Sequence, residues 1–303
     1  MTTLTQQERQ SAVQQYVVSR LATGMVQNKL ATELGISPAH LINVREGKWT
    51  SVSDEVVNRL FAYAKINTKW RILETPNYKA ITELCMDCME NNHFRAIAGF
   101  TGGGKTVALR SFADRHPNAA YVEANILMNR KSFLSAICRA FGMHIDDTAE
   151  GLMNKIVDRM ISEEQTVLLI DDAAKLKDDC FRLLQVIYDK TEGSAGIVIA
   201  GTEKLKKYLD RSAAKDKLSY RELKRRISFW QSLKKPTAVV IKKVAEVYEI
   251  VDKDVIQWLA KEVQDYGTLR NYILNALKVA VVGSNVSVAI LNDLHLGDRA
   301  YRD

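Results

Sequence analysis

The feature that most constrains this chain is a glycine-rich loop between an apolar run and a helix-forming run. Residues 99–106 read Gly-Phe-Thr-Gly-Gly-Gly-Lys-Thr, a complete G-x-x-x-x-G-K-[ST] motif. An apolar strand ends at Ala98, and a helical pattern follows over 107–113. Backbone amides in such a loop wrap around phosphate oxygens, and the next helix directs its positive end at the same anion. The sequence therefore predicts a parallel α/β domain that binds a nucleotide.

The polar residues of this loop have separate predicted tasks. Lys105 is expected to reach the β- and γ-phosphates, and the Thr106 hydroxyl is expected to ligate Mg²⁺. The predicted nucleotide contacts comprise the loop and the start of its helix: Gly99, Thr101, Gly102, Gly103, Gly104, Lys105, Thr106 and Val107.

A second apolar strand, at 166–170, ends in two carboxylates, Asp171 and Asp172. Asp171 is the predicted Mg²⁺ residue, binding the ion directly or through water. The following carboxylate normally polarises the attacking water, and glutamate is usual there. Because Asp172 is one methylene shorter, we expect either slow hydrolysis or a water held in a different way.

Two further positions match the nucleotide sensors of AAA+ ATPases. Thr202 follows a third apolar strand, at 196–201, where its hydroxyl is expected to contact the γ-phosphate or the lytic water. Gly267-Thr268-Leu269-Arg270 opens a helix expected over 271–282, and Arg270 is predicted to touch the γ-phosphate of its own subunit. The alternatives are a plain strand-end turn for Thr202 and a surface arginine for Arg270.

Positive charge is concentrated in residues 203–243. This stretch has 14 Lys or Arg against four acids, a net charge of +10, whereas the whole chain carries +7. Such a local field attracts a polyanion, so contact with nucleic acid or nucleotide is favoured over a solvated helix face. Within it, Arg226 is the first choice and Arg225 the second for a finger that reaches a neighbouring subunit's γ-phosphate. Contact of either arginine with DNA phosphate is the alternative.

The N-terminal part predicts two short helices joined by a tight turn. One runs over 27–34 and is closed by Gly35; Ser37 caps the next, with Pro38 in its first turn. The pair is similar to the helix-turn-helix of phage repressors, with an outward face that would meet the major groove. That face includes His40, Asn43 and Arg45. An oligomerisation or partner-docking module is the alternative, and the net charge of +2 over 1–66 predicts weak, non-specific DNA binding at most.

Composition excludes several classes of protein. With 47% hydrophobic and 26% charged residues among 303, the chain is neither disordered nor fibrous. It has no apolar run of about 18 residues and no signal-peptide pattern, which predicts a cytoplasmic protein without membrane contact. We expect an α/β P-loop core at 67–232, an all-α helix-turn-helix domain at 1–66 and a small helical lid at 233–303.

The ordered set of motifs resembles the AAA+ transposition regulators, including those of phage Mu and of bacterial transposons. Ile72-Leu73-Glu74-Thr75 ahead of the loop and the G-x-L-R segment with apolar residues after it are similar to the Mu-like branch. The resemblance implies an ATP-dependent helical filament of many copies on duplex DNA, which selects target DNA and stimulates a transposase. It also implies that ATP is the nucleotide, that Arg226 acts in trans, and that basic side chains line the DNA-facing surface. These are Lys204, Lys206, Lys207, Arg211, Arg221 and Lys224.

Two other functions fit the same motifs. A helicase loader or replication initiator of the same superfamily would bind a hexameric helicase and prefer single strands. A transcription regulator that uses ATP as a switch would bind a defined operator as a dimer.

Overall fold

The computed structural model describes residues 6–22, 26–67, 70–215, 218–248, 250–280 and 286–300. The chain forms two compact units. One unit comprises Ile72–Lys235 and Asp265–Gly267, and it contains the whole sheet. The other comprises Met1–Arg71, Pro236–Gln264 and Thr268–Asp303.

The sheet has five parallel strands in the order β2-β3-β4-β1-β5. The strands β3 and β4 are buried along their whole length, as expected for the middle of a sheet covered on both faces. The glycine-rich loop leaves β1, which pairs with β4 and β5. The strands are β1 (Phe94–Ala98), β2 (Ala119–Glu123), β3 (Thr166–Asp171), β4 (Ala195–Gly201) and β5 (Phe229–Ser232).

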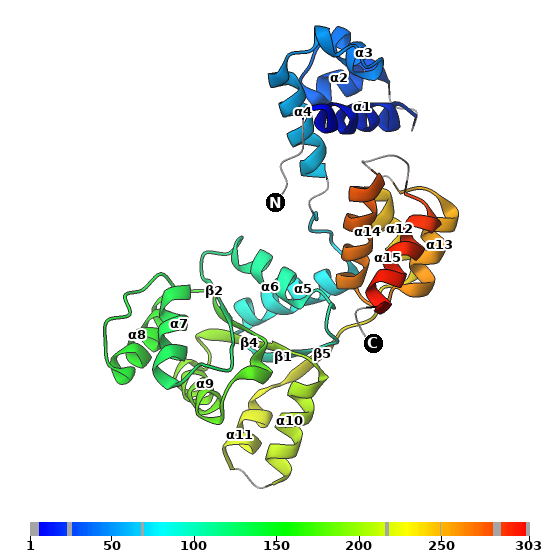
Figure 1. The fold of residues 1–303 in the computed structure, drawn as a ribbon. Helices are drawn as coiled ribbons and strands as arrows, with labels where there is room; N and C mark the ends of the chain where they lie inside the picture. Colours follow the sequence, from blue (N-terminus) through cyan, green and yellow to red (C-terminus); the bar gives the residue numbers. More distant parts are fainter. Residues whose placement is uncertain are drawn as a thin grey trace. The chain divides into compact units, whose positions relative to one another are not determined.

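Helices cover both faces of the sheet, and alternate strand residues are buried against each. Val167 and Leu169 pack with α5 and α6, whereas Leu168 and Ile170 pack on the opposite face with α7 to α11 (Figure 1). The helices are α5 (Pro76–Asn91), α6 (Lys105–Ala113), α7 (Arg130–Ala140), α8 (Ala149–Ser162), α9 (Asp178–Thr191), α10 (Glu203–Ala214) and α11 (Leu218–Arg226). This arrangement confirms the predicted α/β core.

The N-terminal helices enclose a small apolar core of their own. Gly35 ends α2 with φ of 63°, a conformation that glycine adopts without strain. The Ser37 hydroxyl accepts the His40 backbone N–H at 3.1 Å and caps α3, which begins at Pro38. The two predicted helices and their glycine turn are therefore present. The elements are α1 (Gln6–Ala22), α2 (Gln27–Leu34), α3 (Pro38–Arg45), the short 3₁₀ helix η1 (Trp49–Ser51) and α4 (Asp54–Asn67).

The C-terminal region is also helical. Trp258 donates to Asn292 at 2.8 Å, and the hydroxyl of Tyr272 lies 2.6 Å from Nδ1 of His295, which ties three of its helices together. The helix expected over 271–282 begins earlier, at Tyr266, and residues 281–285 lie outside the described part. The helices are α12 (Ala238–Val247), α13 (Lys253–Glu262), α14 (Tyr266–Ala280) and α15 (Val288–Ala300).

Two further findings concern the helices and the cysteines. Among the helices that the structure describes, none combines the length and the apolar character needed to span a membrane. All four cysteines, Cys85, Cys88, Cys138 and Cys180, are buried and free, and burial raises the pKa of each thiol. They are therefore packing residues of the core.

The contact between α5 and the sheet requires a glycine in β4. A Cβ added to Gly196 would lie 2.1 Å from the backbone oxygen of Cys88, which cannot move aside as a side chain would. We expect Gly196→Ala to lower the free energy of unfolding by about 1–3 kcal/mol through overpacking. Urea unfolding followed by circular dichroism measures the change. Ser194→Ala, just before the strand, is the control, and equal midpoints for the two variants would contradict the close contact.

Candidate nucleotide site and basic surface

The glycine-rich loop spans the gap between the last residue of β1 and the first residue of α6. Gly102 and Gly104 have φ of 78° and 90°, in the left-handed region that side chains disfavour. Gly104 stands at the N-cap of α6 without a side-chain cap, so backbone N–H groups open this helix. The loop therefore has the backbone form and helix start that bind phosphate.

The side chain of Lys105, the first residue of α6, extends back to the loop. Its side chain is buried, and Nζ donates to the carbonyls of Gly99 at 3.0 Å and Phe100 at 2.9 Å. Burial lowers the pKa of Lys105, while the nearby carboxylates of Asp171, Asp172 and Glu203 act in the opposite direction. An ammonium has three donors and two are used here, so one remains for an anionic ligand.

Asp171 ends β3 next to the loop and is completely buried. Its Oδ2 accepts the Thr106 hydroxyl at 2.6 Å and the Tyr121 hydroxyl at 3.1 Å, while Oδ1 accepts the Asp172 amide at 2.8 Å. The hydroxyl of Thr106 and the carboxylate of Asp171 thus offer adjacent oxygens, the ligand type that Mg²⁺ prefers. This donor set fits the ion, which would neutralise charge on the phosphate oxygens once bound.

Asp172 has an unusual backbone for a residue with a side chain. Its φ is 51°, and its carboxylate forms an ion pair with Lys175 at 2.6 Å. Among side-chain-bearing residues, aspartate and asparagine adopt this left-handed conformation most readily. The backbone therefore supplies a physical reason for aspartate where glutamate is usual, which sequence reasoning lacked.

Thr202 is brought to the same edge of the sheet by strand order. It directly follows β4, and β4 lies between β1, which leads into the loop, and β3, which ends in Asp171. Thr202 occupies the N-cap of α10, yet its side chain makes no capping hydrogen bond. The hydroxyl is thus not committed to the helix it begins.

The two candidate finger arginines have different surroundings. Arg226, the first choice from sequence, donates through Nη2 and Nε to the two carboxylate oxygens of Asp189, the first at 2.9 Å. Its side chain is only 17% exposed. Arg225 is exposed at the end of α11. Within a single subunit the geometry therefore commits Arg226 to an intrachain pair and leaves Arg225 accessible.

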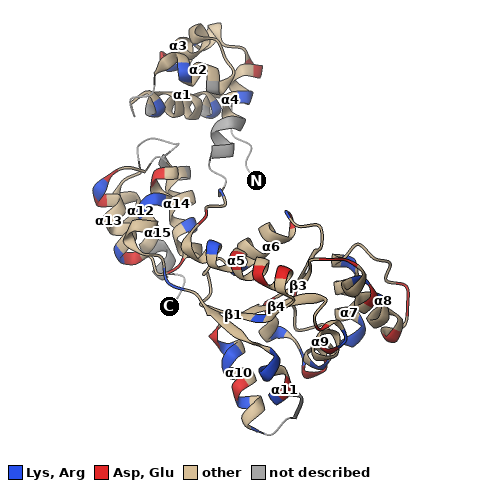
Figure 2. Ribbon diagram, turned by 180° about the vertical axis from the view of Figure 1, so that it is seen from behind, with Lys and Arg blue, Asp and Glu red and all other residues tan. Residues whose placement is uncertain are grey.

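The predicted DNA-contacting residues lie on α10 and α11 of the sheet unit and on α3 of the N-terminal helices. Lys and Arg gather on α10 and α11 (Figure 2). Lys204, Lys207 and Arg211 are exposed, whereas Lys206 lies over the Trp230 ring at 5.7 Å. Lys224 pairs with Asp210 at 2.6 Å, and Arg221 donates to the Ala213 carbonyl at 3.3 Å. On α3, His40 and Asn43 are half-buried and Arg45 is exposed.

Arg270 lies on α14 and is exposed. It belongs to the compact unit that does not contain the glycine-rich loop. Its contact with the γ-phosphate therefore stays a prediction.

Sequence reasoning missed a buried asparagine that supports the loop. The Asn77 side chain donates to the carbonyls of Gly103 at 3.2 Å and Lys234 at 2.8 Å, and its Oδ1 accepts the Lys234 amide at 3.1 Å. It sits in the first turn of α5, which Thr75 caps and Pro76 opens. The Thr-Pro pair is a helix-start signal in the sequence.

A second missed contact comes from the start of α14. The Tyr266 amide donates to the Gly102 carbonyl at 3.0 Å, and a Cβ on Gly102 would lie 2.1 Å from Oδ1 of Asp265. The predicted nucleotide loop is therefore held from outside by residues that the G-x-x-x-x-G-K-T motif does not contain.

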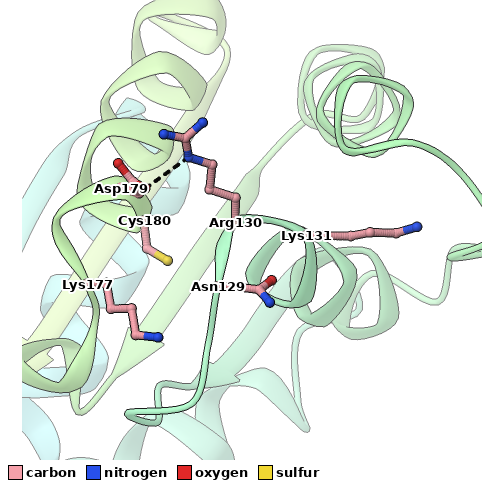
Figure 3. A pocket seen from close by; sticks show the side chains of 6 residues that line it. All are labelled: Asn129, Arg130, Lys131, Lys177, Asp179 and Cys180. Atoms are coloured by element: carbon pink, nitrogen blue, oxygen red, sulfur yellow. Dashed lines mark ion pairs between the residues drawn. The ribbon is translucent and has the colours of Figure 1, made fainter.

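A separate cavity of about 400 Å³ lies between the N-terminal ends of α7 and α9 (Figure 3). Arg130 and Asp179 form an ion pair across it at 3.1 Å, and Lys131 points away from the other lining residues. Asn129 is committed to capping α7. None of the predicted nucleotide residues lines this cavity, which is bordered by Asn129, Arg130, Lys131, Lys177, Asp179 and Cys180.

Comparison with known families places this geometry in a class. Residues 89–209 match the family described as AAA domain. The fold is similar to that of the ORC2 protein of Aeropyrum pernix, with a TM-score of 0.57 at 15% identity over 75% of this chain and 70% of that one. It is also similar to Cdc6p of Pyrobaculum aerophilum, with a TM-score of 0.53 at 15% identity over 71% and 65% of the two chains. Residues 89–209 thus form an AAA domain.

A more particular similarity concerns transposition. Over 190 residues the chain is 23% identical to the Mu-like prophage FluMu DNA transposition protein B of Haemophilus influenzae. The match covers 60% of this chain and 66% of that protein. The resemblance to AAA+ transposition proteins expected from the motifs is therefore confirmed, and the chain spans about two thirds of this relative's length.

We expect the Asn77 contacts to support both the stability and the ligand affinity of the loop. Asn77→Ala leaves the buried carbonyl of Gly103 without this partner, which costs about 1–3 kcal/mol, and removes two part-buried hydrogen bonds to Lys234. Urea unfolding and titration with a fluorescent ATP analogue measure the two effects. Asn91→Ala on the same helix is the control, because Asn91 is exposed and its side chain bonds to the half-buried Asp87. If Asn77→Ala matched this control in both measurements, Asn77 would not support the stability or the ligand affinity of the loop.

Proposed function

We propose that this chain is an ATPase that binds ATP with Mg²⁺, assembles on duplex DNA and activates a transposase. The observation that carries the proposal is the Lys105, Thr106 and Asp171 constellation inside an AAA domain. Similarity to a transposition protein B adds the biological setting. Target selection and a helical filament without strong sequence preference are parts of the same proposal.

In this proposal each residue at the sheet edge has one role. Lys105 neutralises charge on the β- and γ-phosphates, and Thr106 and Asp171 hold Mg²⁺. Asp172 orients the attacking water, Thr202 contacts the γ-phosphate or that water, and Arg270 contacts the γ-phosphate in its own subunit. Because Asp172 is already paired with Lys175, we expect slow turnover until DNA or the transposase changes that pair.

Contact with DNA is proposed to depend mainly on the hairpin of α10 and α11. Exposed Lys204, Lys207 and Arg211 offer charges that bind phosphate without reading bases. On α3, Arg45 pairs with Glu46 at 3.1 Å, and Lys48 pairs with the same carboxylate at 2.7 Å. These pairs offset part of the positive charge, so we propose only a weak DNA or partner contact there.

We expect filaments on random-sequence duplex DNA with ATP, and none with ADP or without nucleotide. Negative-stain electron microscopy of the full chain measures this assembly. Lys105→Ala should abolish it because the γ-phosphate loses its cation. Closed rings without DNA, or binding confined to single strands, would favour a helicase loader or initiator, and a discrete dimer on one sequence would favour a transcription switch.

Two double variants of equal charge provide the control for this experiment. Lys204→Ala with Lys207→Ala removes two exposed cations of α10, and Lys253→Ala with Lys261→Ala removes two of α13. We expect only the first to weaken DNA binding, and to reduce the slope of log K against log salt by about 0.9 for each DNA phosphate that is no longer neutralised. Equal slopes for the two would place the DNA surface elsewhere.

The accessible Arg225 is our proposed finger in an assembled filament, in place of Arg226. We expect Arg225→Ala to lose DNA-stimulated hydrolysis while its unfolding midpoint and ATP-analogue affinity stay unchanged. Arg226→Ala should instead lower the midpoint, because it removes a largely buried side chain together with its ion pair to Asp189.

Mixing subunits tests whether Arg225 acts in trans. Lys105→Ala does not assemble alone, but it has an intact finger, whereas Arg225→Ala has an intact nucleotide site. Lys105→Ala subunits that join Arg225→Ala with ATP on DNA should therefore restore hydrolysis. If the mixture stays inactive while Arg226→Ala with Lys105→Ala recovers, the finger is Arg226.

A further inference from the structure

Tyr121 approaches the proposed magnesium site from a strand that carries no nucleotide motif. Its strand, β2, pairs with β3 so that Tyr121 lies beside Leu169 and Glu123 lies beside Asp171. The Tyr121 hydroxyl donates to Oδ2 of Asp171, the same oxygen that accepts the Thr106 hydroxyl. This oxygen is therefore the meeting point of β2, β3 and α6.

The tyrosine ring is itself held in place by α6, the helix that the nucleotide loop opens. The Arg110 guanidinium lies over the ring, 5.3 Å from its centroid, and pairs with Glu123 of β2. Arg110 follows Thr106 by one helical turn on α6. The two residues that contact Tyr121, Arg110 and Asp171, therefore both lie next to the nucleotide loop. Burial, and then the charge of Asp171, raise the pKa of Tyr121, which keeps the hydroxyl protonated and donating.

A carboxylate rotates easily about its last bond, since this torsion has only broad minima. At Asp171 a backbone amide fixes one oxygen, and Thr106 and Tyr121 fix the other. Thr106 is itself a proposed ligand of the ion. Tyr121 is then the side chain that can keep Asp171 oriented without contacting the ion.

We infer that Tyr121 is a positioning residue for the magnesium carboxylate, acting through its hydroxyl on Asp171. This inference rests on the proposed nucleotide function. Loss of a hydrogen bond to a metal-binding carboxylate typically costs 10–100-fold in metal affinity. Tyr121→Phe removes the hydroxyl, with its hydrogen bond to Asp171 and its interaction with Arg110, while the ring under Arg110 remains.

The experiment measures fluorescence of an N-methylanthraniloyl ATP analogue bound to the full chain, first in EDTA and then during titration with Mg²⁺. We expect Tyr121→Phe to bind the analogue in EDTA with wild-type affinity and to need at least about tenfold more Mg²⁺ for half of the metal-dependent change. The EDTA titration also shows that the variant is folded at the site.

Tyr78→Phe is the matched control. Its hydroxyl lies 2.8 Å from that of Ser111 and accepts a hydrogen bond from Arg115 at 2.9 Å, so it contacts α6 away from Asp171. We expect this variant to keep the wild-type Mg²⁺ requirement.

Three outcomes would overturn the inference. An unchanged Mg²⁺ requirement in Tyr121→Phe, or an equal shift in Tyr78→Phe, removes the special role of the Tyr121 hydroxyl. Loss of analogue binding in EDTA means that Tyr121 supports the loop and not the metal carboxylate. Failure of the wild-type chain to bind the analogue at all would instead refute the proposed nucleotide function.

Discussion

A buried carboxylate must be surrounded by hydrogen-bond donors, because removing its charge from water is otherwise too costly. Asp171 has no exposed surface, and its donors come from three elements: the start of α6, the neighbouring strand β2 and the chain just after β3. Satisfying this one group therefore fixes the loop helix, the strand pairing and the turn at Asp172 relative to one another. The metal chemistry proposed for the site uses a side chain whose position the fold has already determined.

The glycine-rich loop is also held by hydrogen bonds, in this case to its carbonyl oxygens. Lys105 bonds to two loop carbonyls from inside, while Asn77 and Tyr266 bond to the carbonyls of Gly103 and Gly102 from outside. Their hydrogen bonds satisfy carbonyl oxygens, which leaves backbone N–H groups of the loop for an anion. The carbonyls of Gly99, Phe100, Gly102 and Gly103 are thus satisfied within the protein.

Local patterns predicted the loop, the strand ending in Asp171 and the helices around Gly35, because each depends on neighbouring residues. Asn77 and Tyr121 could not be found in the same way. Asn77 meets Lys234 at a separation of 157 residues, and Tyr121 meets Asp171 across 50. The choice between Arg225 and Arg226 likewise depends on Asp189 of α9, 37 residues before Arg226. Such pairs follow from strand order and helix packing, which a motif search does not contain.

The contact between Gly102 and Asp265 changes how the motif itself is understood. In G-x-x-x-x-G-K-T, position 102 accepts any residue, and relatives of the superfamily are free to differ there. In this chain the carboxylate at the start of α14 occupies the space that a Cβ would need. A phosphate loop from another ATPase that has a side chain at position 102 would therefore clash with Asp265. Such a transplant needs either the matching start of α14 from the same donor or a shorter residue at 265. In a chimera, the loop and the first turn of that distant helix form a single exchangeable part.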